Sequence, residues 1–564
     1  MKKHYETHVE DTDKLISVAG PILEYKSWYE QYRKLMEEQA QRKYGLYTPT
    51  SEGDEDDFPS IPGMIARYSA SGLTNEQMKE NPVWVDKTGN GHDLQMKNFA
   101  WGGMSGVGGY GDENYQTFYK FTLDDYVFIA SPPGVKHMNF TFRVTGLQPR
   151  NKLTLAFFGT TNTVYGTWDK DGIYTVDADI VEAGKPTYFY NGYGATRGEF
   201  TIEILPLYPG ALVFDGVDDY GVCDNFPILT KEKGYTVVAL RQWLSFQDIG
   251  YPTLVVNSTD RLAAFSFEDF RSKTKSTWNW GRSVGLSDYK IPLLYTYQTS
   301  TSYNSKTIYA GATEEGSNIL RVCRSGIYCA NAAIWEIVIL DHDATEEELT
   351  KIKDYFVKTY PWLFSDQAWT VVGKTNEDED RATIANITGN GNDLVLSNFG
   401  FAEGSGYNEE GEYAGYLVTD GVDDRVQDSS FKLNKDWTLV GEWVFLNQKA
   451  TNAGITKPFS FVVYNRTTGL SLFINTGTSG ITIENVKSIK AICSDGRIYL
   501  DDWSEMLISK DQNITSSTSV LSIGFNGTAY TQMAFKNLGI YNNQILSKDD
   551  CIKAYNYLQT LKAK

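Results

Sequence analysis

The chain contains the phrase Thr88-Gly-Asn-Gly-His-Asp-Leu-Gln-Met-Lys-Asn-Phe99 and repeats it, 300 residues later, as Thr388-Gly-Asn-Gly-Asn-Asp-Leu-Val-Leu-Ser-Asn-Phe399. A second phrase, Val213-Phe-Asp-Gly-Val-Asp-Asp219, returns as Val418-Thr-Asp-Gly-Val-Asp-Asp424 at an offset of 205. Echoes that keep their order along a chain are the signature of an internal repeat. The two phrases therefore predict a duplicated domain.

A third echo pairs Ala333–Leu340 with Ala534–Tyr541 at an offset of 201 and completes the repeat. Between the first two echoes the offset falls from 300 to 205, so the first copy carries about 95 additional residues there. A segment of that length is sufficient for a small domain. We therefore expect a domain inserted into the first copy, with the ends of the insert, near Tyr110 and Pro209, close together.

The composition is that of a multidomain globular protein. At 564 residues, the length predicts three to four domains of ~150 residues each. Acidic residues outnumber basic ones by 71 to 52, giving a net charge of −19. This charge disfavours nucleic acid and anionic membranes, which carry the same sign, and leaves neutral sugars as ligands. Neither an apolar run of about 18 residues nor an apolar signal region is present, so no membrane insertion is predicted.

Cysteine usage indicates the compartment in which the chain folds. The count is odd, the residues are scattered and no Cys-x-x-Cys pair occurs, which favours free buried thiols, although Cys323 and Cys329 could meet across a bend. The five are Cys223, Cys323, Cys329, Cys493 and Cys551. Assembly in a reducing host cytoplasm follows, while the Gly-, Tyr- and Thr-rich body is typical of proteins that work outside cells. A virion component would meet both conditions.

The N-terminal segment predicts a helix of ~23 residues over about 21–44, beginning after Gly20 and ending at Gly45. It precedes an acidic linker, Ser51–Asp57. A helix of this length is not stable alone, so its aromatic stripe needs a partner. That partner is either its own β-domain or another protein in an anchoring or oligomerisation contact. The stripe includes Trp28, Tyr29, Tyr32 and Leu35.

From about Ile61 onward, short apolar runs alternate with Asn-Gly, Asp-Gly and Gly-Gly pairs. This spacing predicts antiparallel sandwiches rather than parallel β-α-β units. Each repeat is expected to close on a helix with a polar cap, starting at Thr345 and at Ser547. The apolar residues predicted to pack these helices onto the sandwiches are Leu349, Ile352 and Phe356 in the first, and Ala554, Tyr555 and Leu558 in the second.

The Thr-Gly-Asn-Gly turn, the Asp-Gly-Val-Asp-Asp phrase, an aromatic-Thr-aliphatic strand and an acid-capped closing helix follow one another in both copies. This order resembles the concanavalin A-like, laminin-G-like jelly-roll domain. The resemblance implies a mainly β fold, with two such sandwiches, a small β-sandwich insert in the first, and an N-terminal α-helix. The implied domains are 1–57 (helix and linker), 58–111 plus 209–363 (first sandwich), 112–208 (insert) and 364–564 (second sandwich). Such domains are commonly carbohydrate-binding or adhesive, and they recur in appendages of tailed phages.

Two acidic motifs could hold a metal ion. Three carboxylates fall within five residues in each copy, and we favour turns in which the Asp side chains accept backbone N–H groups. The alternative is a hard-cation site, with calcium as the candidate cofactor. The residues are Asp215, Asp218 and Asp219 in the first copy, and Asp420, Asp423 and Asp424 in the second. The phrase Asp86–Gly91 resembles the start of an EF-hand loop, but Lys97 occupies the position that needs a bidentate Glu, so that geometry is rejected.

No catalytic constellation is apparent. The five histidines are isolated, and neither a P-loop, an HExxH motif nor the Glu-x-Asp-x-x-Glu strand of the sandwich-fold glycosidases occurs. We therefore predict that the chain is not an enzyme. Exposed aromatic side chains, on which sugar rings stack, are the candidate ligand contacts, with core packing as the alternative for each. These candidates are Trp278, Trp280, Tyr295, Tyr297, Tyr190 and Tyr193.

These patterns together predict a phage virion appendage protein, a head or tail fibre or decoration, that acts in host attachment and display and contacts cell-surface glycans. Its partners would be other virion proteins, bound through the N-terminal helix, and further copies of the chain. The alternatives are a polysaccharide-degrading enzyme with lectin-like modules, a secreted carbohydrate-binding adhesin, and a purely structural decoration without a ligand.

Overall fold

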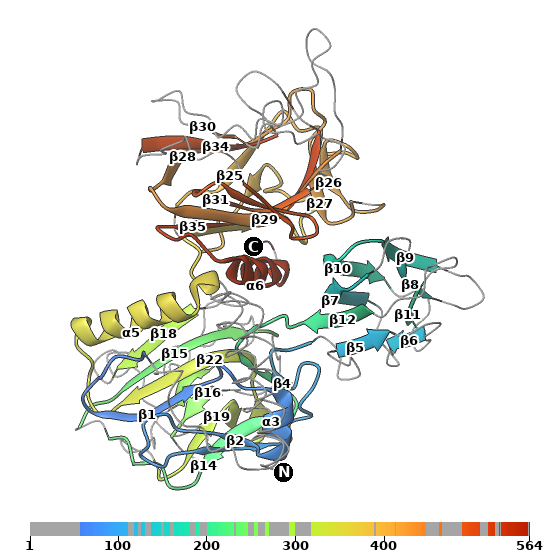
Figure 1. Cartoon of the computed structure of the whole chain (residues 1–564). Helices are drawn as coiled ribbons and strands as arrows, with labels where there is room; N and C mark the ends of the chain where they lie inside the picture. Colours follow the sequence, from blue (N-terminus) through green and yellow to red (C-terminus); the bar gives the residue numbers. More distant parts are fainter. Residues whose placement is uncertain are drawn as a thin grey trace, which may run out of the picture. The chain divides into compact units, whose positions relative to one another are not determined.

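The structure is a computed structural model, and within its described residues the protein is mainly β, with every sheet antiparallel (Figure 1). Contacts group Ser60–Lys564 into one unit. Among the described helices, none combines the length and the apolar composition needed to cross a membrane. The described residues are 57–110, 118–121, 126–129, 137–147, 152–157, 163–179, 187–191, 200–230, 233–245, 253–257, 266–269, 293–298, 317–388, 391–411, 413–446, 462–464, 488–507, 517–524, 530, 532–561 and 563.

The first repeat consists of two six-stranded sheets. The first sheet has the order β18 (Leu293–Gln298), β15 (Thr236–Trp243), β22 (Asn331–Leu340), β13 (Leu212–Asp215) and β4 (Gly106–Val107), and β1 (Met64–Ser69) also pairs with β22. The second has the order β17 (Ser266–Asp269), β16 (Thr253–Val256), β19 (Leu320–Val322), β14 (Tyr220–Cys223), β3 (Leu94–Lys97) and β2 (Val83–Trp84). A short hairpin, β20 (Arg324–Ser325) and β21 (Tyr328–Cys329), and a helix, α3 (Asn75–Glu80), complete it.

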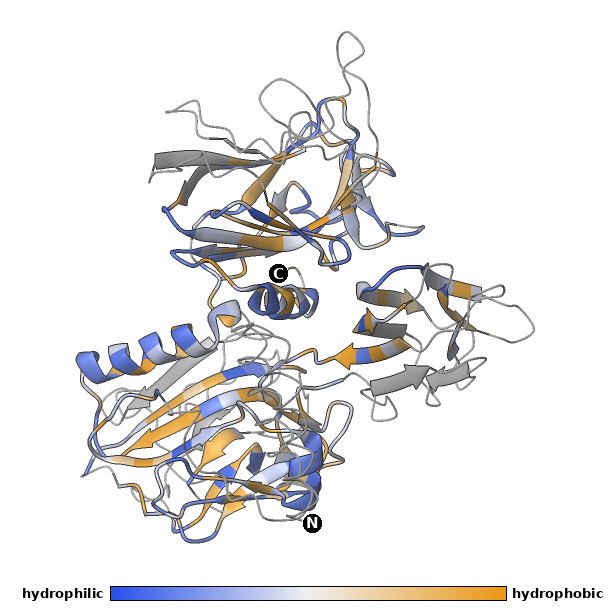
Figure 2. Cartoon of the chain, in the orientation of Figure 1, coloured by the Kyte–Doolittle hydropathy of each residue, from blue (hydrophilic) through white to orange (hydrophobic). Residues whose placement is uncertain are grey.

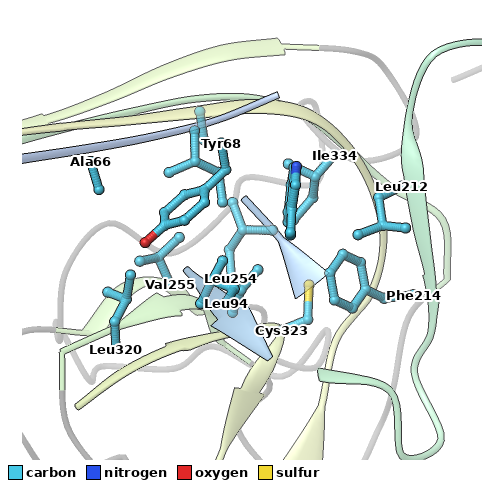
Figure 3. Packing of buried hydrophobic residues seen from close by; sticks show 14 of the residues in the cluster. Ala66, Tyr68, Leu94, Leu212, Phe214, Leu254, Val255, Leu320, Cys323 and Ile334 are labelled. Atoms are coloured by element: carbon cyan, nitrogen blue, oxygen red, sulfur yellow. The ribbon is translucent and has the colours of Figure 1, made fainter. Parts of the chain in front are cut away.

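Both sheets of the first repeat contribute to one core (Figure 3). Tyr68 and Ile334 enter it from the first sheet, and Leu94 and Val255 enter it from the second. Strand β15 is buried along its whole length, because the outer face of its sheet is covered as well. This explains why such strands read as continuous apolar runs rather than alternating ones. In Figure 2 the apolar residues concentrate on these central strands.

The second repeat has the same strand order as the first. Its larger sheet runs β26 (Gly406–Asn408), β27 (Tyr416–Val418), β35 (Met533–Asn542), β29 (Trp437–Phe445), β31 (Ser488–Cys493), β32 (Arg497–Leu500) and β33 (Glu505–Leu507), with β23 (Gln367–Thr370) paired to β35. The other runs β24 (Thr383–Ile384), β25 (Leu394–Ser397), β28 (Arg425–Leu433), β34 (Ser517–Ile523) and β30 (Val462–Tyr464). The sequence β4-β13-β22-β15-β18 thus matches β26-β27-β35-β29-β31, and β2-β3-β14-β19-β16 matches β24-β25-β28-β34-β30. The internal repeat in the sequence is therefore a repeat of topology.

The segment between β4 and β13 forms two further four-stranded sheets around a separate core. One has the order β10 (Gly172–Asp179), β7 (His137–Thr145), β12 (Phe200–Leu205) and β5 (Phe118–Phe121). The other has the order β6 (Tyr126–Ile129), β11 (Thr187–Asn191), β8 (Leu153–Phe157) and β9 (Thr163–Trp168). We call this segment the insert.

The two connections to the insert are hydrogen-bonded to each other. The Leu207 N–H donates to the Gly109 carbonyl at 2.8 Å, and the Tyr208 N–H donates to the Gly108 carbonyl at 2.7 Å. The expected proximity of the insert's ends is thereby confirmed. In the second repeat the equivalent strands, β26 and β27, are joined only by the short segment after Asn408. The insert therefore occupies the place of a single loop.

Each repeat closes on a helix with the predicted cap. Helix α5 (Glu346–Thr359) begins with a capping box in which Thr345 and Glu348 exchange hydrogen bonds, and the Ser547 hydroxyl accepts the Asp550 N–H at the start of α6 (Lys548–Gln559). A 3-10 turn, η2 (Pro361–Leu363), follows α5. Ile352 and Phe356 are fully buried, as are Ala554, Tyr555 and Leu558. The prediction that Leu349 is buried is wrong. This residue lies one turn into α5 and is only half-buried.

Candidate functional site

In the first repeat the Thr-Gly-Asn-Gly phrase forms a turn held by one polar side chain. The Asp86 carboxylate accepts hydrogen bonds from the backbone N–H groups of Arg67 at 3.1 Å, Thr88 at 3.0 Å and His92 at 3.3 Å. In the second repeat the Asn386 side-chain oxygen accepts the N–H of Thr388 at 3.1 Å. The oxygen atoms that a cation would require are thus engaged by the turn itself.

The two aspartate phrases also fold into turns with matching hydrogen bonds. Asp215 Oδ1 accepts the N–H of Val217 at 2.7 Å, and Asp219 Oδ2 accepts the N–H of Asp215 at 3.0 Å. The equivalent bonds in the second repeat are 2.7 Å from Val422 to Asp420, and 2.7 Å from Asp420 to Asp424. In each repeat these carboxylates therefore stabilise the turn between two strands, β13 and β14 in the first repeat and β27 and β28 in the second.

Electrostatics distinguishes one aspartate in each of these turns. Burial raises the pKa of Asp219 to about 7 and the pKa of Asp424 to about 6, and the backbone hydrogen bonds only partly oppose this. The three carboxylates of each group have oxygen atoms within 4.8 Å of one another, a spacing that a cation could bridge. Their backbone hydrogen bonds already explain the arrangement as a turn, and calcium binding stays a prediction.

In each repeat, one asparagine that the sequence analysis did not identify forms hydrogen bonds to the backbone of the strand next to the aspartate turn. The Asn75 side chain exchanges two hydrogen bonds with the backbone of Val107, at 2.7 and 3.2 Å. Asn376 does the same with Tyr407, at 2.8 Å for both. A Cβ atom on Gly106 or Gly406 would lie 2.4 Å from the asparagine oxygen, so glycine is required there. The signal was available, because the glycines recur at the offset of 300 of the first repeated phrase and the asparagines recur at 301.

Tyr190 lies on the outer face of the insert. Its neighbour Phe189 enters the core of the insert, whereas Tyr188 and Tyr190 alternate to the opposite face of β11 and are half-buried. The register places Tyr190 beside Thr154 and Tyr188 beside Ala156. A partly exposed pair of aromatic rings beside small residues is a surface on which a sugar ring can stack. We call Tyr188 and Tyr190 the tyrosine face.

The other predicted aromatic contacts are not brought to this face by the described structure. On strand β18, Tyr295 pairs with Ala239 and Tyr297 pairs with Val237 of strand β15. The side chains of Ala239 and Val237 belong to the core of the first repeat. Trp278, Trp280 and Tyr193 lie outside the described residues. The proposed anchoring stripe, Trp28, Tyr29, Tyr32 and Leu35, also lies outside them.

A depression of about 410 Å³ lies in the second repeat at the loop that corresponds to the insertion point. Its polar lining includes three exposed carboxylates, Glu403, Glu409 and Glu410, and the side chain of Asn408. Carboxylates and amides accept hydrogen bonds from hydroxyl groups, and ionised acceptors make the stronger bonds. The lining is therefore chemically suited to a polyhydroxylated ligand. We call it the acidic depression.

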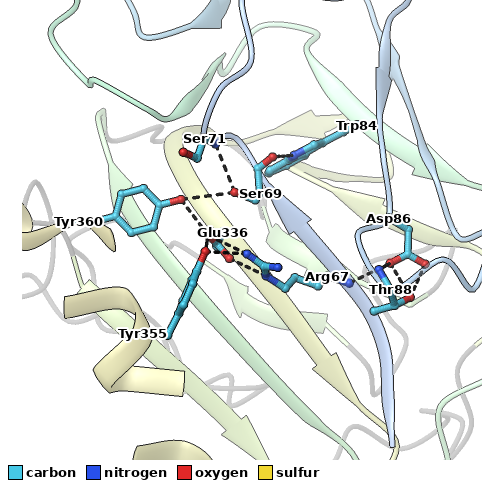
Figure 4. Close-up of polar contacts among 9 residues, drawn as sticks. All are labelled: Arg67, Ser69, Ser71, Trp84, Asp86, Thr88, Glu336, Tyr355 and Tyr360. Carbon is cyan, nitrogen blue, oxygen red and sulfur yellow. Dashed lines mark hydrogen bonds and ion pairs between the residues drawn. The ribbon is translucent and has the colours of Figure 1, made fainter. Parts of the chain in front are cut away.

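A buried charge cluster lies beneath the closing helix of the first repeat (Figure 4). Arg67 donates to Glu336 at 3.0 Å and to the Tyr355 hydroxyl at 2.8 Å, and the Tyr360 hydroxyl donates to Glu336 at 2.9 Å. Burial raises the pKa of Glu336 despite its pairing with Arg67. The cluster connects β1 and β22 to α5 and is enclosed by protein, so we assign it to docking of the helix.

The second repeat also has a buried charge cluster beneath its closing helix, built from different charges on the strands β29 and β31. Lys490 donates to Glu442 at 2.9 Å and to the Tyr555 hydroxyl at 2.8 Å, and that hydroxyl donates to Glu442 at 2.8 Å. Burial alone would raise the pKa of Glu442, but Lys490 and Lys536 outweigh it and lower the pKa to about 2. Tyr355 and Tyr555, the tenth and the eighth residue of their helices, thus both connect a closing helix to a buried ion pair.

Comparison with known proteins does not identify a family. No protein-family model and no curated protein matches the chain. Among solved structures, a Trypanosoma rangeli sialidase in complex with sialic acid aligns at 10% identity over 74% of this chain and 77% of its own, with a TM-score of 0.22. A protein from Parabacteroides distasonis aligns at 7% identity over 49% of this chain and 97% of its own, with a TM-score of 0.12. Scores this low show no shared fold.

Proposed function

We propose that the chain is an attachment and display protein of a phage virion, that its two repeats are laminin-G-like jelly-roll domains, and that it contacts glycans without chemical turnover. The observation that carries the proposal is the shared strand order of the two repeats, each with two sheets on one core. Together with the sequence phrases that resemble laminin-G-like domains, this supports a scaffold whose loops and faces present ligand contacts. A duplicated scaffold also suits binding, because two weak sites on one chain increase avidity.

The polar groups of the described residues support binding rather than catalysis. The aspartate turns and the buried clusters are accounted for by turns and helix docking, as their hydrogen bonds indicate. Two surfaces are left for a glycan: the tyrosine face of the insert and the acidic depression of the second repeat. The first would stack on a sugar ring, and the second would accept hydrogen bonds from its hydroxyl groups.

The test is binding of the full chain to an array of bacterial surface glycans, followed by titration of any ligand found. We expect Tyr190→Ala, or the double substitution Glu409→Gln/Glu410→Gln, to weaken binding about tenfold, since each removes contacts worth more than about 1 kcal/mol. Tyr328→Ala, on the β20–β21 hairpin, is the matched control and should bind normally.

The same glycans report on the rival function. Incubation with the chain should release no reducing ends, whereas turnover would overturn the proposal in favour of a polysaccharide-degrading enzyme. Absence of binding to every glycan, with the protein folded, would remove the glycan contact and leave a structural decoration.

A further inference from the structure

His342 lies where the central strand of the first repeat meets its closing helix. It follows Leu340, the last residue of β22, and precedes Thr345, the capping residue of α5. Its side chain is 33% exposed, so the ring can exchange protons with solvent. The proposed ligand surfaces do not include it.

Each nitrogen of the His342 ring faces a carboxylate. Nδ1 lies 3.1 Å from Asp341 Oδ1, and Nε2 lies 3.3 Å from both carboxylate oxygens of Glu348. An ionised carboxylate only accepts hydrogen bonds, and a neutral imidazole has one N–H to donate, whereas the protonated ring has two. Both contacts are therefore hydrogen bonds only when His342 carries a proton on each nitrogen.

The backbone on both sides of the ring is held in place. The Thr236 hydroxyl, at the start of β15, donates to the His342 carbonyl and accepts the Ala344 N–H, both at 2.8 Å. The Asp341 N–H donates to the Gly63 carbonyl at 2.9 Å. A Cβ atom on Gly63 would lie 2.1 Å from Asp341 Oδ1, so this segment packs closely over the carboxylate. The fold therefore fixes the place of the ring between its two partners.

Glu348 serves the helix as well as the histidine. Its Oε2 atom accepts the Thr345 N–H at 2.8 Å and the Thr345 hydroxyl at 2.9 Å, which completes the capping box of α5. Loss of the proton from His342 would place a ring lone pair against this carboxylate or against Asp341. The ring is thus coupled to the residue that starts the helix.

The surrounding charges favour the protonated ring. Burial alone would lower the pKa of His342, but the hydrogen bonds to Asp341 and Glu348 outweigh it and raise the pKa above the ordinary value of 6.5. The same two carboxylates are the charged groups that act on the ring most strongly. Other charged residues on the segments around it are Lys233, Asp343, Glu346, Glu347 and Lys351.

We propose that His342 is a pH-sensitive clasp, whose protonated ring bridges Asp341 and Glu348 and holds the first turn of α5 to the end of β22. Loss of the proton breaks one of the two bonds and loosens that turn. This proposal does not depend on the proposed function.

The direction of the effect follows from the raised pKa. A group whose pKa is higher in the folded chain stabilises it fully below the unfolded value, here 6.5, and the stabilisation is lost as the pH rises through the folded value. The first turn of α5 should therefore open more often in mildly alkaline solution than in mildly acidic solution.

The experiment measures hydrogen exchange of the full-length protein by mass spectrometry at about pH 5.5 and about pH 8.5, on either side of the ordinary histidine pKa. Peptides from the start of α6 are the internal control, because its cap uses Ser547 and Asp550 and contains no histidine. The ratio of α5 to α6 protection removes the chemical effect of pH on exchange. We expect this ratio to fall about two- to fivefold at the higher pH, as for a partly exposed ion pair.

Two variants separate the clasp from the helix cap. Glu348→Gln keeps a residue that can complete the capping box and removes the charge that faces Nε2, so the helix should remain and the change with pH should shrink. His342→Gln should abolish the change. Because Asp219 also titrates in the first repeat, each variant is compared with the wild type at the same pH. A wild-type ratio that is the same at both pH values, or a change with pH that persists in full in either variant, would overturn the proposal.

Discussion

Replacement of Lys490 by methionine tests whether the buried cluster of the second repeat stabilises the fold through charge. Lys490 and Glu442 are both 8% exposed, and the Tyr555 hydroxyl connects them. Lys490→Met keeps most of the apolar stem and removes the cation. Glu442 would then lie buried without its main partner, which typically costs about 3–5 kcal/mol.

The pKa of Glu442 reports the combined effect of burial and of its partners, among which Lys490 lowers it most. The folded value is about 2 against an ordinary value of 4.5, and at ~1.36 kcal/mol per pKa unit this corresponds to about 3 kcal/mol. Because the folded pKa is lowered, this stability is fully present above pH 4.5 and is lost as the pH falls toward 2. The free energy of unfolding of the wild type should therefore exceed that of Lys490→Met by about 3 kcal/mol at pH 7. This difference in stability should become smaller below pH 4.5.

The assay is guanidinium unfolding followed by thiol labelling and mass spectrometry. Labelling of Cys493 and Cys551 reports on the second repeat, and labelling of Cys223 and Cys329 reports on the first, because all four are buried. Lys351→Met is the control: its pair with Glu347 is exposed and should contribute less than about 0.5 kcal/mol. The double variant Lys490→Met/Glu442→Gln should recover at least half of the free energy of unfolding that Lys490→Met loses. A destabilisation no larger than that of Lys351→Met, or a difference from the wild type that stays the same between pH 7 and pH 3, would show that the charge of Lys490 does not stabilise the fold.

Four further outcomes are expected. Phe356→Ala, which removes a fully buried ring from α5, should destabilise the first repeat by about 3–5 kcal/mol; an unchanged unfolding midpoint at Cys223 and Cys329 would show that the helix is peripheral. Replacing residues 112–208 with a short Gly-Ser bridge should leave both repeats folded by circular dichroism, because β4 and β13, the strands that flank the deleted segment, pair with each other; aggregation of the deleted chain beside a soluble second repeat would contradict the nested arrangement. Because the folded pKa of Asp219 is raised to about 7, stability should fall as the pH rises from about 4 to 7, and Asp219→Asn should flatten this slope in thermal melts; an identical slope in the variant would exclude Asp219 as its source. Removal of residues 1–50 should leave both repeats folded but reduce incorporation into particles, or multimer mass by light scattering; normal assembly would favour a helix packed on its own domain.

The repeated phrases predicted a mainly β chain with a duplicated strand order because each phrase encodes a local turn. In both copies a polar side chain at the position of Asp86 or Asn386 accepts N–H groups two residues away, which is a short-range pattern that sequence can reveal. The helix caps at Thr345 and Ser547 were predictable for the same reason. Leu349 was misplaced because helical periodicity gives the buried stripe, but it does not say how far the sheet extends beneath the helix.

The long-range clusters were not predictable from spacing. Arg67 and Glu336 are 269 residues apart, and Asn376 reaches a strand 31 residues away. One signal was present: Glu336 and Glu442 each interrupt an otherwise apolar strand that is covered on both faces. A carboxylate in such a position requires a buried partner. The sequence could therefore have indicated that partners existed, although it could not have identified them.

The most direct test of the central claim is quantitative mass spectrometry of purified phage particles from a host that expresses the intact gene. If the chain is a virion protein, peptides from both repeats and from the insert should co-purify with the particles in fixed ratio to the capsid protein. Glycan-binding activity should be retained on those particles and reduced by Tyr190→Ala. Recovery of the chain only from the host cell or the medium, with none on particles, would contradict a role in the virion.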